Sequence, residues 1–205
     1  MPRKAREVLV GYPHHIILRG INKQAVFLRD EERQKFLDLV FESGQSFDVQ
    51  IHAYVLMTNH VHLLVTPFNP QALSAFVRGF SQKYVQFFNF YYQRTGTLWE
   101  GRFKSYPIQE NSYALSCQRY IELNPVKANM VTHPRDYKWS SYQQNFNKDD
   151  RRLTTLPLMS DMHQTGDYES YVLSGLGTDP GTDPGTDPVW GWLECEVVEV
   201  TGIDG

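Results

Sequence analysis

The sequence predicts an α+β fold: a ferredoxin-like antiparallel sheet in the order β-α-β-β-α-β, with one helix added at its C-terminal end. Segments with the periodicity of strands and helices follow in the order strand, helix, strand, strand, helix, strand, helix. The first six match the ferredoxin-like order. The seventh segment, residues 112–124, has no place in that order, so we expect it to pack as an extra helix.

The first two elements are a strand and a helix. Residues 12–19 (YPHHIILR) have the apolar and β-branched content of a strand. A helix is predicted over residues 29–44, where apolar residues recur at helical spacing. Asp30 is its expected N-cap and Gly44 its expected end.

A hairpin follows this helix. Apolar residues alternate over positions 49–57, which predicts a strand with one apolar face. That face comprises Val49, Ile51, Ala53, Val55 and Met57. The pair Thr58 and Asn59 forms the expected tight turn into the next strand, so the two strands are predicted to be antiparallel neighbours.

A long helix is predicted over residues 70–93, with Gly96 closing it. Its large apolar side chains recur at a spacing typical of one helix face. They are Leu73, Phe76, Val77, Phe80, Tyr84, Phe87 and Tyr91. We expect the aromatic ones to lie in the core and not to form a platform for stacking bases.

The last predicted elements precede residue 146. Residues 103–109 read as a strand, in which Pro107 indicates a sheet edge or a bulge. The next helix is expected to end near Asn124, because Pro125 disfavours helical geometry in the residue before it. Residues 133–145 are the expected last ordered segment.

Composition divides the chain into a predicted domain, residues 1–150, and a predicted acidic tail, residues 151–205. All 20 Lys and Arg lie at or before Arg152, and with 13 acidic residues they give residues 1–160 a net charge of +7. The other 10 acidic residues give the rest of the chain a charge of −10. GTDP repeats three times over residues 177–188, a composition typical of a linker.

The charge asymmetry favours a polyanionic partner for the basic region. A solvated surface with a solubilising tail explains it equally well. A further hypothesis is that the acidic tail folds back and competes with the polyanion, so that truncation near residue 150 would raise affinity at low salt.

Other features exclude a membrane protein. No apolar stretch approaches the roughly 20 residues that a membrane span needs, and the N-terminal apolar run is too short for a secretory signal. Cys117 and Cys195 have no metal-binding or redox spacing, which suits a reducing cytoplasm. We expect a cytoplasmic, nucleoid-associated protein.

Two histidines lie one residue apart in the stretch TNHVHLLV, residues 58–65. Alternate residues of a strand share a face, so His60 and His62 project side by side while Val61 faces the core. Two neutral imidazoles at this separation can bind one divalent cation. Alone, the pattern also fits two histidines on the solvent side of a strand.

A second motif lies in the stretch QRYIELNP, where Tyr120 and Asn124 are four residues apart on one helix face. Asn offers a carbonyl oxygen to a hard cation, and a Tyr oxygen is a competent nucleophile for phosphoryl transfer. Alone, the motif also fits an ordinary helix end. Glu122 points away from Tyr120 and is expected to be solvated.

Together the two motifs resemble the HUH (histidine–apolar–histidine) single-strand tyrosine transposases of bacterial insertion sequences, and more closely the REP-associated tyrosine transposases. The resemblance spans roughly residues 10–145. It is carried by HHIILRG (14–20), MTNHVHLLV (57–65), GTLWEGRFKS (96–105), RYIELNPVKANMV (119–131) and YKWSSY (137–142).

The resemblance implies an HUH endonuclease and strand transferase that cuts and rejoins single-stranded DNA beside REP-type hairpins. Tyr120 would be the nucleophile that forms a 5′-phosphotyrosine. His60, His62 and Asn124 would bind the metal, Mg²⁺ or Mn²⁺. Relatives act as monomers or as dimers with exchanged tyrosine helices, so this chain is expected to be a monomer or a dimer.

The expected partner is single-stranded or hairpin DNA. The candidate DNA contacts are Arg19, Asn22, Arg78, Lys83, Trp99, Arg102, Lys104, Arg119 and Lys127. Basic residues would bind phosphates, and Trp99 would stack a base or lie in the core. Three alternatives stay open: a non-catalytic protein that binds DNA hairpins, an RNA-binding ferredoxin-like module, and a hydrolase that uses metal-bound water.

Overall fold

The computed structural model describes residues 8–147, 152–157, 159 and 167–176 of the 205-residue chain. The elements in chain order are β1 (His14–Arg19), η1 (Ile21–Lys23), α1 (Asp30–Ser46), β2 (Val49–Leu56), β3 (His60–Pro67), α2 (Ala72–Tyr91), β4 (Lys104–Pro107), α3 (Asn111–Lys127), η2 (Pro134–Asp136), α4 (Tyr142–Asn147) and α6 (Tyr168–Ser174).

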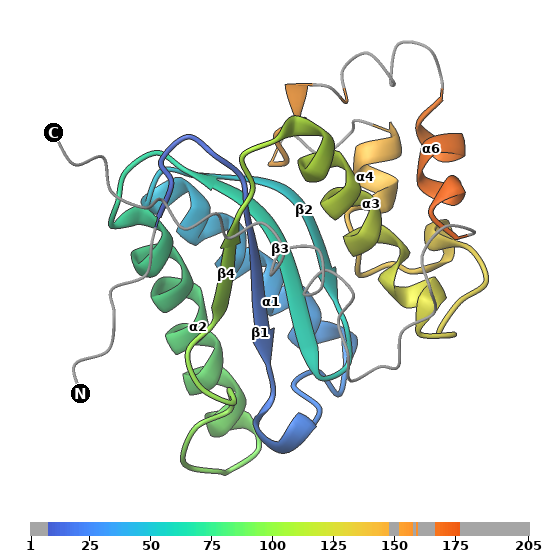
Figure 1. Cartoon of the computed structure of the whole chain (residues 1–205). Coiled ribbons are helices and arrows are strands. Elements are labelled where there is room, and N and C mark those ends of the chain that lie inside the picture. The colour runs from blue at the N-terminus through green and yellow to red at the C-terminus, as the bar shows by residue number, and fades with distance from the viewer. Residues whose placement is uncertain (1–7, 148–151, 158, 160–166, 177–205) are drawn as a thin grey trace, which may run out of the picture.

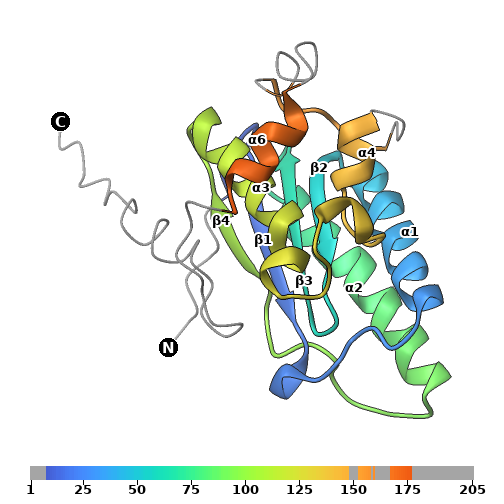
Figure 2. The ribbon, with the colours of Figure 1, turned by 90° about the vertical axis from the view of Figure 1, so that its right-hand side faces the viewer.

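The centre of the fold is a four-stranded antiparallel sheet with the strand order β2-β3-β1-β4. Helices α1 and α2 cover one face of the sheet, and α3 lies on the other with α4 and α6 beside it (Figure 1 and Figure 2). The predicted α+β fold, with its antiparallel sheet and extra helix, is confirmed. The hairpin between β2 and β3 is confirmed too, and β4 is an edge strand, as Pro107 indicates.

Both ends of α1 differ from the prediction. Its N-cap is Arg29, not Asp30, because the Glu32 carboxylate accepts a hydrogen bond from the Arg29 backbone N–H at 3.1 Å. The helix also continues past Gly44. A Cβ at Gly44 would lie 3.1 Å from the Val49 carbonyl oxygen, so this glycine allows the helix to pack closely on β2 and does not end it.

Helix α2 ends at Tyr91, and Gly96 lies in the loop beyond it with a φ of +88°. The first five residues predicted to lie in the core are buried. In the last turns of the helix the buried residue is Phe88, and not Phe87 or Tyr91 as predicted. Tyr91 is 50% exposed. Residues on one face of a helix recur every 3.6 positions on average, so the core position after Tyr84 is Phe88, four residues later, and not Phe87.

Neither α2 nor any other described helix has the length and apolarity that crossing a membrane requires.

Helix α3 does not end near Asn124 but runs through Pro125 to Lys127. Proline removes only one backbone donor, and the next turn is retained by the Ala128 N–H, which donates to the Asn124 carbonyl at 2.9 Å. The Pro125 ring is buried, so packing against the body of the protein compensates for the lost hydrogen bond.

Strand β2 contains a bulge that divides its apolar residues between two faces. The pairs Ile51–Val65 and Ala53–Leu64 leave one extra residue on β2. The alternation of side chains is therefore interrupted, and the five residues predicted to share one face do not share it. They are nevertheless buried, because helices cover both faces of the sheet here.

The chain after α3 packs along β2. The Leu56 N–H donates to the Trp139 carbonyl at 2.9 Å, so residues 133–145 belong to the body of the protein. The prediction that they are the last ordered segment is wrong, because α6 follows them. Packing continues past residue 150, the end predicted for the first region, because four later residues lie in the same core. They are Leu156, Met159, Tyr168 and Val172. The GTDP repeat, residues 177–188, lies outside the described residues.

Candidate active site

The histidine pair lies on the face of the sheet that α3 covers. His60 and His62 of β3 have ring centroids 5.0 Å apart at an interplanar angle of 86°. Val61 and Leu63 point to the opposite face and are fully buried, as the alternation predicts. His62 is only 2% exposed and His60 is half-buried, so the two histidines do not both face solvent.

Tyr120 of α3 lies directly against this pair. Its ring meets His62 edge-on, with centroids 5.7 Å apart, and is 9% exposed. Asn124 follows one turn later on the same helix and is half-buried. The structure therefore brings Tyr120 next to the histidine pair within one chain and places Asn124 on the same side of α3.

A short chain of hydrogen bonds orients the His60 ring. The Asn59 amide donates to the Lys23 carbonyl at 3.1 Å, so its oxygen is the atom that lies 2.7 Å from His60 Nδ1. An amide oxygen only accepts, so Nδ1 carries the proton and donates. The lone pair of His60 is then on Nε2, the form in which an imidazole binds a metal.

A third imidazole, His15 of β1, was missed by the sequence analysis. Its Nε2 lies 2.9 Å from His62 Nδ1, and its ring is also 6.1 Å from that of Tyr120. Its signal in the sequence is its position in HHIILRG, an apolar strand that is also one of the stretches carrying the family resemblance. Which residue of β3 it faces depends on the strand register, which the sequence does not specify.

The electrostatics of the cluster keep His62 neutral. Burial lowers its pKa well below the ordinary value of 6.5, and the neighbouring His60 and His15 lower the pKa further. Within the described residues, no group of three or more His, Cys, Asp or Glu is arranged to bind a metal. The three imidazoles thus do not form a site by themselves, and a site here needs a different third donor.

Part of the predicted DNA-contact set lies on the same face as the histidines. The register aligns Lys104 of β4 with Ile17 of β1, and Ile17 with His62, so the three share one row and one face. Arg19 pairs with His60 in the same way, and its Nε also contacts Glu100 at 2.5 Å.

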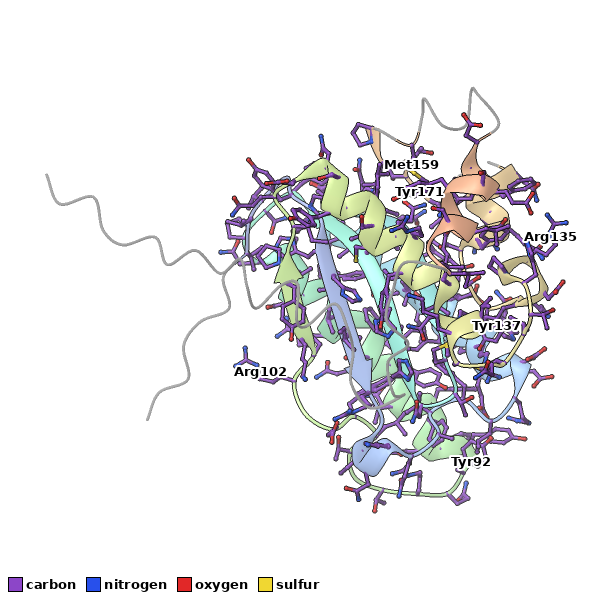
Figure 3. The ribbon with its side chains drawn as sticks, turned by 45° about the vertical axis from the view of Figure 1, so that its right-hand side comes forward. Tyr92, Arg102, Arg135, Tyr137, Met159 and Tyr171 are labelled. Atoms are coloured by element: carbon purple, nitrogen blue, oxygen red, sulfur yellow. The ribbon has the colours of Figure 1, made fainter. Side chains whose placement is uncertain are left out.

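Lys127 and Arg119 lie on α3. The Lys127 ammonium is 5.5 Å from the centroid of the Tyr120 ring, beside the site. Arg119 contacts Ser174 Oγ at 3.2 Å and the ring of Tyr171, so its guanidinium is engaged with α6. Asn22 lies in η1, and Arg102 extends from the loop before β4 (Figure 3).

Three members of the predicted set lie elsewhere. Arg78 and Lys83 belong to α2, on the opposite face of the sheet, where Lys83 pairs with Glu42 of α1 at 2.5 Å. Trp99 is 8% exposed and packs against Phe36 with centroids 6.1 Å apart. A buried indole has no open face for a base, so the stacking role predicted for Trp99 is wrong and the core alternative holds.

Glu122 of α3 is fully buried, so the prediction that it is solvated is wrong. Its carboxylate accepts hydrogen bonds from Asn145 at 2.7 Å, Ser141 at 3.0 Å, Gln118 at 3.4 Å and the Tyr168 hydroxyl of α6. Burial raises the pKa of the carboxyl above 4.5, and these hydrogen bonds oppose the shift. Glu122 thus joins α3 to α4 and α6, close to Tyr120.

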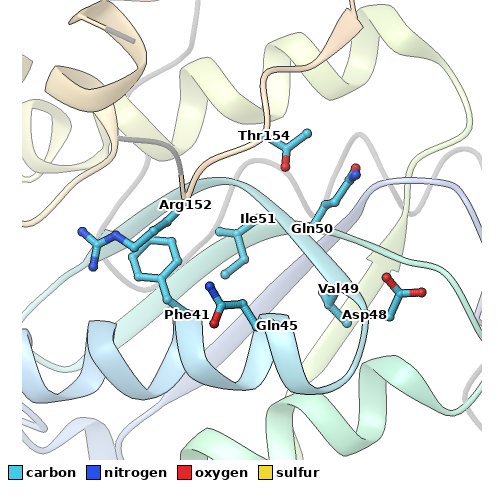
Figure 4. A pocket seen from close by; sticks show the side chains of 9 residues that line it. Phe41, Gln45, Asp48, Val49, Gln50, Ile51, Arg152 and Thr154 are labelled. Carbon is cyan, nitrogen blue, oxygen red and sulfur yellow. The ribbon is translucent and has the colours of Figure 1, made fainter. Parts of the chain in front are cut away.

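A hollow of about 240 Å³ lies between α1, the start of β2 and residues 152–154 (Figure 4). The Arg152 guanidinium is 4.3 Å from the centroid of the Phe41 ring at its wall. No residue of the histidine–tyrosine cluster lines it. The hollow is therefore separate from the candidate site.

Three solved structures resemble this chain, and the first of them shares its fold. A REP-associated tyrosine transposase bound to a REP hairpin has 20% identity and a TM-score of 0.61, covering 76% of this chain and 90% of that chain. A candidate transposase of Deinococcus radiodurans R1 has 20% identity and a TM-score of 0.42, covering 59% and 96%. A tRNA(His) guanylyltransferase of Saccharomyces cerevisiae has 12% identity and a TM-score of 0.42, covering 91% and 86%. At 20% identity the likeness to the first structure concerns the fold alone.

The sequence match is more specific. None of the curated proteins matches this chain. Residues 10–124, more than half of the chain, match the family model described as "Transposase IS200 like". This span includes β3 with both histidines and α3 up to Asn124. The chain therefore belongs to the IS200-like transposase family, and its role is the processing of DNA.

Proposed function

We propose that the protein cleaves and rejoins single-stranded DNA beside REP-type hairpins through a 5′-phosphotyrosine on Tyr120. The observation that carries this proposal is the contact between the Tyr120 ring and His62, 5.7 Å apart, in one chain. The fold shared with a hairpin-bound transposase supports the choice of substrate. Because one chain supplies both groups, a monomer contains a complete site.

We also propose that His60, His62 and Asn124 bind Mg²⁺ or Mn²⁺. The donor set fits: one imidazole carries its proton on Nδ1 and its lone pair on Nε2, the other is held neutral by burial, and the amide of Asn124 offers a hard oxygen. When bound, the cation would withdraw charge from a phosphate oxygen during displacement. Three protein donors leave room for the DNA phosphate.

The reaction at Tyr120 is a transesterification. The phenol oxygen forms a bond to the phosphorus, the bond from phosphorus to the 3′ oxygen breaks, and the phenol loses its proton while the 3′ oxygen gains one. The number of phosphodiester bonds is unchanged, so the reverse attack by a 3′-hydroxyl rejoins the strand without ATP. The Lys127 ammonium, 5.5 Å from the Tyr120 ring, contributes positive charge where the phosphate must approach.

The DNA is proposed to lie over the β1–β4 half of the site face, where Ile17 and Arg19 are partly exposed and Lys104 is exposed. Lys104→Ala should weaken hairpin binding and reduce the salt slope of the affinity by about 0.7–0.9, the value for one phosphate contact. Anisotropy titrations at several salt concentrations measure this slope.

The matched control for this prediction is Lys83→Ala, on the opposite face of the sheet and paired with Glu42. It should leave both affinity and salt slope as in the wild type. Equal losses in the two variants would place the DNA elsewhere.

The proposal is tested with a labelled single-stranded hairpin incubated with the full chain and Mg²⁺ or Mn²⁺. We expect a protein–DNA adduct that resists denaturant and that EDTA prevents. A hydrolase would release cut DNA without an adduct, and a non-catalytic hairpin-binding protein would retain intact DNA. A preference for RNA without cleavage would favour the RNA-binding alternative.

A further inference from the structure

His15 lies next to His62, one of the proposed metal ligands, but is not itself one of them. Strand β1 pairs with β3 so that Ile17 faces His62, and His15, two residues earlier, reaches the same face. The rings of His15 and His62 are nearly parallel, with centroids 5.1 Å apart and planes at 21°. Both side chains are buried, and Nε2 of His15 lies 2.9 Å from Nδ1 of His62.

The hydrogen bond between these imidazoles requires one proton on one of the two nitrogens. If it resides on His62 Nδ1, then His62 donates, and its Nε2 keeps a lone pair. If it resides on His15 Nε2, then His62 accepts, and its own proton lies on Nε2, which closes that nitrogen to a metal. The contact with His15 thus determines which nitrogen of His62 is available.

We infer that His15 is a positioning residue, which accepts the Nδ1 proton of His62, fixes its tautomer and holds its ring against Tyr120. This inference rests on the proposed function, because it assumes that His62 binds a cation. The His15 ring also meets the Tyr120 ring edge-on at 6.1 Å, so one side chain packs against both the ligand and the nucleophile.

The neighbouring His14 provides a matched control. It is equally buried in β1 but points to the opposite face, and each of its ring nitrogens meets a backbone group: the Leu9 N–H donates to its Nε2 at 3.2 Å, and its Nδ1 lies 2.9 Å from the Tyr12 carbonyl. A histidine with a purely structural role at this depth should affect folding but not metal affinity.

The experiment measures Mn²⁺ binding to the full chain by electron paramagnetic resonance, without DNA. His15→Phe, which keeps a ring but loses the nitrogen, should weaken Mn²⁺ binding about 10–100-fold, the usual effect of removing the hydrogen-bond partner of a ligand. His15→Gln, whose amide oxygen can accept in place of Nε2, should restore affinity to within about threefold. His14→Phe should bind Mn²⁺ as the wild type does.

The outcomes separate this inference from the proposed function. If the wild type binds Mn²⁺ and His15→Phe binds it equally well, the positioning role is wrong and the metal site stands. If the wild type binds no Mn²⁺, the metal site itself is wrong and the inference falls with it.

A measurement on the wild type covers the case in which His15→Phe does not fold. Long-range proton–nitrogen NMR correlations of the metal-free protein should show His62 protonated on Nδ1. A proton on His62 Nε2 would overturn the inference.

Discussion

Tyr120→Phe should abolish the covalent protein–DNA adduct and slow strand cleavage by about 10⁴-fold or more, because it removes the oxygen proposed as the nucleophile. Phenylalanine keeps the ring that packs against His62 and His15, so folding and hairpin binding should remain near the wild-type level. Single-turnover cleavage, followed on a denaturing gel, measures the effect.

The control for this substitution is Tyr113→Phe. Tyr113 is another partly buried tyrosine of α3, two turns before Tyr120. Adduct formation by this variant should match the wild type. Persistence of the adduct in Tyr120→Phe would show that another group is the nucleophile.

Glu122→Ala should lower the free energy of unfolding by about 2–4 kcal/mol, because it leaves several buried donors without their acceptor. These donors come from α3, the segment that leads into α4, α4 itself and α6, so the loss should also loosen α6. Urea denaturation measures the stability, and hydrogen exchange in residues 168–174 reports the docking of α6.

Glu122→Gln is the matched variant. It keeps the shape and one acceptor oxygen, and the Tyr168 hydroxyl can accept from the new amide. It should therefore retain most of the stability that Glu122→Ala loses. Equal destabilisation by Ala and Gln, or no effect of either, would contradict the role of this carboxylate as the junction between α3 and α6.

The overall fold was predictable because periodicity and element order are local properties of the sequence. The alternation HVHLLV places His60 and His62 on one face whatever the rest of the chain does, and the spacing of Tyr120 and Asn124 places both on one side of a helix. The pairing of the two motifs is a matter of topology: α3 has no place in the β-α-β-β-α-β order, so the family resemblance implied the pairing and the element order did not.

The features that the sequence did not predict depend on tertiary packing. Glu122 appeared solvated because its second neighbour, α6, comes from residues 168–174, within the region assigned to an acidic tail. Truncation near residue 150 would remove that helix. A test of the tail hypothesis by truncation therefore needs a chain that ends after Leu176.

The sequence also did not predict on which face of the sheet a charged residue lies. Lys104 and Lys83 are both exposed lysines, yet the register of β4 brings the first to the row of His62 while α2 directs the second to the other face. The contact between His15 and His62 depends on the same register, since the two residues are 47 positions apart.

The most direct test of the central claim is mass-spectrometric mapping of the DNA-linked peptide from a wild-type reaction with a hairpin substrate and Mg²⁺. The peptide that contains Tyr120 should carry a nucleotide through its 5′ phosphate, at the phenol oxygen. A nucleotide on a different residue, or complete strand cleavage with no modified peptide, would contradict the claim that the tyrosine beside the histidine pair carries out the chemistry.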